Sequence, residues 1–189
     1  MKPIHILTVT LLFIIAILLT MILLRQTRPE PPLPGPSDNS VSTFEDCVEA
    51  GNPVMESYPR QCRHDGELYV EAIGNELEKN HLIQLASPRP NEFISSPLTI
   101  EGEARGTWFF EATFPIVLTN WDGLIIAEGY ATADGEWMSE DFVPFTATLE
   151  FETPGVYDRG SLILQRSNPS GLPENDDALE IPIRFSSVK

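Results

Sequence analysis

Residues 145–151 read Phe-Thr-Ala-Thr-Leu-Glu-Phe, and every second side chain in this stretch is apolar. Successive side chains of a β-strand point to opposite faces, so a period of two is typical of a strand with one face in a core and the other in water. Similar alternation recurs at residues 98–104, 112–118 and 179–185. The stretch therefore predicts a half-buried strand of an all-β domain.

Turn signals divide the surrounding sequence into further short strands. Asp122-Gly123 separates two apolar runs, and Asp-Gly at such a point favours a tight hairpin. Seven strands in all are predicted within residues 81–189, and this number and size indicate an antiparallel immunoglobulin-like β-sandwich. Pro115 and Pro182 lack an amide hydrogen, which indicates edge positions or bulges. The other three predicted strands cover residues 82–86, 124–130 and 161–166.

The amino-terminal segment predicts a membrane anchor. Ile6 to Leu24 is a stretch of 19 uncharged residues. As a helix it would be roughly 28 Å long, close to the thickness of a bilayer's hydrocarbon core. A cleaved signal peptide would have a shorter apolar region and a small-residue cleavage site, neither of which is present. We expect residues 1–28 to be a transmembrane anchor, with the body outside the cytoplasm.

The segment between anchor and sandwich divides into two parts. Five prolines fall within residues 29–36, which favours a stiff polyproline stalk, and residues 29–43 are therefore predicted to be a linker. Residues 44–74 contain the only two cysteines, Cys47 and Cys62, separated by two turn signals. This segment is too small to fold on its own core, so we predict a stabilising disulfide. The alternatives are a metal site that includes His64 and a Cys62–His64 nucleophile–base pair.

The charge of the chain bears on its partners. Nine basic and 28 acidic residues remain from Pro29 onward, a formal charge of −19. Phosphate binding needs a basic surface, so no nucleic-acid partner is expected. No phosphate loop, serine elbow or zinc-protease motif occurs, and the prediction names no catalytic residue, metal ligand or cofactor. The acidic loop at residues 173–177 is the best candidate for calcium, although turns are often rich in such residues.

One aromatic run breaks the alternation. Arg105-Gly106-Thr107-Trp108-Phe109-Phe110 combines arginine with three aromatic rings, as interface anchors do, so Arg105, Trp108 and Phe109 form a candidate interface. The alternative is a bulge that turns both Trp108 and Phe110 into the core.

Several segments resemble those of one family, in the expected order over residues 83–185. The chain resembles the immunoglobulin-like domain of bacterial spore germination proteins. That resemblance implies a location in the cell envelope and a non-enzymatic, interaction-type role, and it supplies no catalytic residues. The segments that carry it are Ser95-Ser96-Pro97-Leu98, Glu103-Ala104-Arg105-Gly106-Thr107-Trp108-Phe109-Phe110-Glu111, Gly135-Glu136-Trp137-Met138, Val143-Pro144-Phe145 and Asn168-Pro169-Ser170-Gly171.

Taken together, the sequence predicts a single-pass protein anchored through residues 6–24 that displays a non-catalytic binding or assembly module. Its expected partner is an envelope protein or polysaccharide. An envelope hydrolase or its accessory, and a structural subunit of an envelope complex, are the alternatives, because such sandwiches serve many functions.

Overall fold

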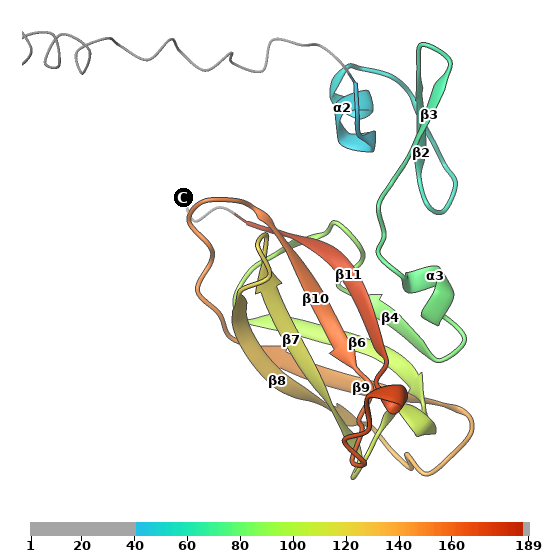
Figure 1. Ribbon diagram of the computed structural model, residues 1–189, viewed down its shortest axis with the longest axis vertical. Coiled ribbons are helices and arrows are strands. Elements are labelled where there is room, and N and C mark those ends of the chain that lie inside the picture. The colour runs from blue at the N-terminus through green and yellow to red at the C-terminus, as the bar shows by residue number, and fades with distance from the viewer. Residues whose placement is uncertain (1–40, 187–189) are drawn as a thin grey trace, which may run out of the picture. The chain divides into compact units, whose positions relative to one another are not determined.

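The computed structural model describes residues 41–186 (Figure 1). The predicted anchor at residues 6–24 and the prolines at 29–36 lie outside the described residues. Within residues 41–186, no helix is both long enough and apolar enough to cross a bilayer.

The two-cysteine segment contains more regular structure than the sequence predicted. Helix α2 is followed by a small antiparallel sheet in the order β1-β2-β3. Thr43 caps the helix and Asp46 completes a capping box. Asp65-Gly66 joins β2 to β3 with positive φ at both residues, as a tight hairpin turn requires. The bounds are α2 Phe44–Glu49, β1 Val54–Met55, β2 Gln61–His64 and β3 Glu67–Val70.

The body begins with one short helix and continues as eight strands. The extra strand is β5, which has only two residues and is therefore too short to show alternation. The count of seven was thus one too low for the body, and the described chain has eleven strands in all. The elements are α3 Glu76–Lys79, β4 Ile83–Ser87, β5 Phe93–Ile94, β6 Leu98–Arg105, β7 Thr113–Asn120, β8 Ile125–Ala133, β9 Phe142–Leu149, β10 Arg159–Gln165 and β11 Ala178–Phe185, with 3₁₀ turns at Gly106–Trp108 and Pro173–Asn175.

These strands follow the connectivity of an immunoglobulin-like sandwich. One layer has the order β4-β6-β9 and the other β8-β7-β10-β11-β5. The layers are joined at one corner, where Thr132 and Ala133 of β8 pair with β9. β5 adds to β11 in parallel, whereas the longer pairings are antiparallel (Figure 1).

The core lies between the two layers and contains the side chains that the alternation assigned to the inside. Pro182 fits its strand because its nitrogen faces away from β10: its carbonyl, on the same side, accepts from the Asn91 amide at 2.7 Å. The fully buried strand residues include Ile83, Ile100, Phe114, Ile116, Leu118, Phe145, Leu162, Leu164, Leu179, Ile181 and Phe185.

Candidate functional site

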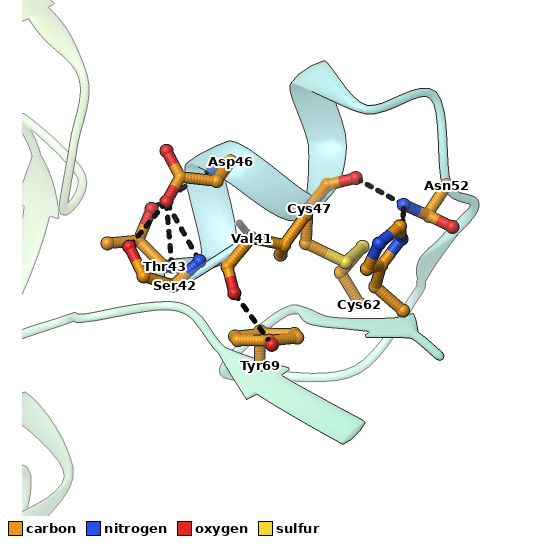
Figure 2. Close-up of a disulfide and its surroundings, with 9 residues drawn as sticks. Val41, Ser42, Thr43, Asp46, Cys47, Asn52, Cys62 and Tyr69 are labelled. Atoms are coloured by element: carbon orange, nitrogen blue, oxygen red, sulfur yellow. Dashed lines mark hydrogen bonds between the residues drawn. A yellow bond between two sulfur atoms is a disulfide. The ribbon is translucent and has the colours of Figure 1, made fainter. Parts of the chain in front are cut away.

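Cys47 and Cys62 form the predicted disulfide (Figure 2), with an S–S distance of 1.95 Å and a Cα–Cα distance of 6.1 Å. Both residues are fully buried, and the bond joins α2 to β2. The sulfurs are bonded to each other, so neither serves here as a nucleophile or a metal ligand. The His64 ring instead lies 3.0 Å from the Asn52 amide nitrogen, which also donates to the Cys47 carbonyl at 2.9 Å.

The polar contacts around the disulfide hold the short helix in place. Ser42 and Thr43 donate to the Asp46 carboxylate, and these hydrogen bonds lower the pKa of Asp46 to about 2. The Tyr69 hydroxyl donates to the Val41 carbonyl at 2.9 Å (Figure 2). These hydrogen bonds join residues within the segment, so they stabilise its own fold.

Buried Glu71 ties the two-cysteine segment to the sandwich. The Arg60 guanidinium donates to both Glu71 carboxylate oxygens, at 2.8 and 2.6 Å. The Asn91 amide, from the loop between β4 and β5, donates to the same carboxylate at 3.1 Å. These donors outweigh burial and lower the pKa of Glu71.

A second buried carboxylate, Glu76, lies at the start of α3. Arg89 pairs with it at 2.8 Å, and the Tyr58 hydroxyl donates to it. Arg89 also donates to the Tyr58 hydroxyl at 2.9 Å and lies over the Tyr58 ring. Burial raises the pKa of Glu76, against the opposing effect of Arg89.

This group borders a cleft of about 620 Å³ on the outer face of β4, β6 and β9. Its floor includes Gly102, and its walls carry Leu77 together with the carboxylates of Glu101 and Glu103. A cleft lined this way offers hydrogen-bond acceptors and negative charge, which suits polar or cationic ligands. Its one arginine, Arg89, is already engaged by Glu76 and Tyr58.

The structure corrects the placement of two predicted interface residues. Trp108 is 1% exposed and Phe109 is 4% exposed, because the 3₁₀ turn at Gly106–Trp108 directs both rings into the core. Arg105 is half-buried: its guanidinium lies 4.0 Å from the centre of the Phe142 ring and donates to the Glu140 carbonyl at 2.9 Å. The bulge alternative was right about Trp108 and wrong about Phe110, which is 45% exposed.

Two of the three carboxylates in the acidic loop at residues 173–177 have partners within the chain. Asp177 pairs with Lys79 at 2.5 Å, and Asp176 accepts from the Asn168 amide at 2.7 Å. Within the part of the chain that the structure describes, no three histidine, cysteine or acidic residues are grouped to hold a metal ion.

An exposed apolar cluster at one end of the sandwich was not predicted from the sequence. We call it the end surface, and it comprises Trp121, Leu124, Ile125, Val156 and Tyr157, each at least half exposed. The Trp121 and Tyr157 rings meet edge to face, with centroids 4.6 Å apart. Clustered exposed apolar side chains of this kind mark interaction sites. The only sequence signal was the hairpin turn at Asp122-Gly123, which keeps Trp121 out of the core.

Comparison with known families gives one match. Residues 82–171 match the family model described as the immunoglobulin-like domain of bacterial spore germination. The match confirms the resemblance seen in the sequence. No curated protein and no solved structure gave a match.

Proposed function

We propose that this chain is a membrane-anchored extracytoplasmic protein that presents an immunoglobulin-like domain as a non-catalytic binding or assembly module. Residues 82–171 match the family model described as the immunoglobulin-like domain of bacterial spore germination. The family match is the observation that carries the proposal. It supports an interaction role for this domain.

The location is supported by two independent features. The disulfide between Cys47 and Cys62 favours an oxidising compartment, since cytosolic thiols are normally kept reduced. The uncharged stretch at residues 6–24 has the length of a membrane-spanning helix. Together they support an anchored amino terminus and a body outside the cytoplasm.

The end surface is the contact region that we assign to this role. Loops at the end of an immunoglobulin-like sandwich are a common binding site, because the sheets hold them rigidly. Trp121 and Tyr157 are the kind of residue that contributes most to protein interfaces. Both are exposed here, at 54% and 52%.

Capture from host cell fractions tests the binding role. The full chain, in a nonionic detergent, is mixed with the cell-wall fraction and separately with the membrane-protein fraction. We expect one discrete partner, and Trp121→Ala combined with Tyr157→Ala should weaken its capture at least tenfold. Met138→Ala removes an apolar side chain elsewhere that is even more exposed, at 78%, and should leave capture unchanged. Equal loss in both variants, or no partner in either fraction, contradicts the proposal.

Protease accessibility tests the location. An added protease should cleave the body in spheroplasts whose membrane is intact. Protection until the cells are lysed would place the body in the cytoplasm and contradict the proposed topology.

A further inference from the structure

Strand β8 has an open outer edge. It pairs with β7 along almost its whole length but with β9 only at Thr132 and Ala133. No other strand within residues 41–186 pairs with the outer side of β8 from Ile125 to Ala131. In Figure 1, β8 accordingly forms the left border of the sandwich. An edge of this kind presents unpaired backbone groups to an incoming strand.

The hydrogen bonds at the end of β8 show which backbone groups face outward. The Ala133 amide donates to Ala112, on the β7 side, at 2.8 Å, and the Asp134 amide donates to Pro144, on the β9 side, at 2.7 Å. Successive residues of a strand alternate between its two sides, so Glu128 and Tyr130 direct their N–H and C=O groups outward. Together they offer a strand-length template of donors and acceptors.

Side chains around this edge define what it would accept. Tyr130 is 68% exposed and flanks the open backbone. The edge leads into a cleft of about 490 Å³ whose apolar walls include Trp121, Leu124 and Val156. The cleft lining also contains Glu152 and contains no basic residue. Glu128 is exposed on the same strand, two residues after Ile126 of the lining, and adds a further negative charge to the edge.

We propose that the outer edge of β8 binds an extended segment of a partner protein as an additional strand, with basic side chains near Glu128 and Glu152 and an apolar side chain in the cleft. Backbone pairing supplies affinity in this mode, and the pockets beside the strand supply specificity. The inference rests on the proposed function, because it names the kind of partner that the module takes.

Two other occupants fit the edge less well. If two copies of the chain paired through this edge, Glu128 of one copy would face the same acidic edge of the other. Both copies also carry a formal net charge of −16, so they would repel each other. The proline-rich stretch at residues 29–36 lacks most of the amide hydrogens that an edge strand must donate. A basic and apolar partner segment avoids both problems.

A defined peptide tests the mode of binding. The probe is a ten-residue peptide alternating lysine and valine, titrated against the full chain in nonionic detergent micelles and followed by amide NMR shifts. We expect the largest shifts at Glu128 and Tyr130. The same peptide N-methylated at every residue keeps its charge and side chains but cannot donate backbone hydrogen bonds, and should bind at least tenfold more weakly. Equal binding of both peptides would mean simple charge attraction and overturn the proposal.

A pair of variants at one position separates the backbone from the side chain. Tyr130→Ala removes the ring and keeps the outward N–H, whereas Tyr130→Pro removes both. Strand addition predicts at least tenfold weaker peptide binding for the proline variant than for the alanine variant. Pro182 shows that this sandwich accepts proline where the nitrogen faces away from the neighbouring strand. Similar affinities for the two variants overturn the proposal.

Charge reversal provides a second test that does not depend on the fold of the proline variant. Glu128→Lys should weaken binding of the lysine peptide and strengthen binding of a peptide alternating glutamate and valine. No change for either peptide overturns the proposed recognition. If Tyr130→Pro still captures the partner from cell fractions as Tyr130→Ala does, strand addition fails while the proposed function stands. If the lysine peptide binds specifically but no cellular partner is captured, the proposed function fails while strand addition stands.

Discussion

Two glycines in neighbouring regions of the sandwich should respond very differently to alanine. Gly102 lies in β6, where an added Cβ would meet the Gln84 carbonyl oxygen at 2.3 Å and the Phe145 ring at 2.7 Å. The first obstacle is backbone of the paired strand β4, and the second is a ring that is 1% exposed. Neither can move without disturbing the ladder or the core.

Gly129 in β8 is the matched control. An added Cβ there would meet only the end of the Leu149 side chain at 2.6 Å, which can rotate away. Neither glycine has a φ in the left-handed region, so the comparison depends on space alone. Overpacking costs about 1–3 kcal/mol, and the loss of glycine's freedom in the unfolded chain returns about 0.4–1 kcal/mol.

We therefore expect Gly102→Ala to lower the free energy of unfolding by about 2 kcal/mol or more, and Gly129→Ala to change it by less than about 1 kcal/mol. Urea unfolding of the full chain, followed by tryptophan fluorescence, measures both values, because the ring of Trp108 leaves the core on unfolding. Equal stability losses in the two variants would refute the assigned packing of β6 against β4 and β9.

Three further predictions concern the disulfide, the buried carboxylates and the core tryptophan. Reducing Cys47–Cys62 should remove about 3 kcal/mol from the two-cysteine segment, by the chain-entropy relation for a loop of about 15 residues, and hydrogen exchange should rise there while the sandwich stays protected. Glu71→Gln should destabilise more at pH 7 than at pH 4, because a lowered pKa contributes stability above the ordinary value of 4.5 and loses it on acidification. Glu76→Gln should be better tolerated at pH 7 than Glu71→Gln. The raised pKa of Glu76 means that the folded chain favours its neutral form and loses this stabilisation as pH rises, whereas glutamine resembles the neutral form at every pH. Similar pH profiles for the two variants would contradict this reasoning. Trp108→Ala should cost about 3–5 kcal/mol, and Trp108→Phe much less, because the ring nitrogen of Trp108 has no hydrogen-bond partner among the described residues; an unchanged melting temperature for the alanine variant would contradict its place in the core.

The sequence predicted what depends on local pattern. Alternation located β6, β9 and β11, because inward residues such as Ile100 and Phe145 recur with period two. Asp122-Gly123 correctly marked the β7–β8 hairpin. The only two cysteines, separated by two turn signals, correctly predicted the Cys47–Cys62 disulfide. The predicted core face of β9 was therefore correct, although the strand begins at Phe142 rather than Phe145.

The features that were missed depend on contacts between distant residues or on very short elements. β5 is defined by its pairing with Arg184 and Phe185 rather than by a pattern of its own. Helix α2 does have a local signal, the capping box of Thr43 and Asp46, although the predicted elements did not include this helix. The burial of Phe109 follows from the 3₁₀ turn at Gly106–Trp108, which the alternation of side chains does not encode. The open edge of β8 arises where it diverges from β9, and no local pattern encodes that divergence.

The last strand also has a consequence for where the domain is cut. The family match ends at residue 171, whereas β11 begins at Ala178 and contributes Leu179, Ile181 and Phe185 to the centre of the core. A truncated gene product ending at the match boundary would leave one whole side of β10 without its neighbour, and such a fragment should collect in inclusion bodies. Shuffling or transplanting this domain into another protein thus requires the segment through Ser186 to travel with it.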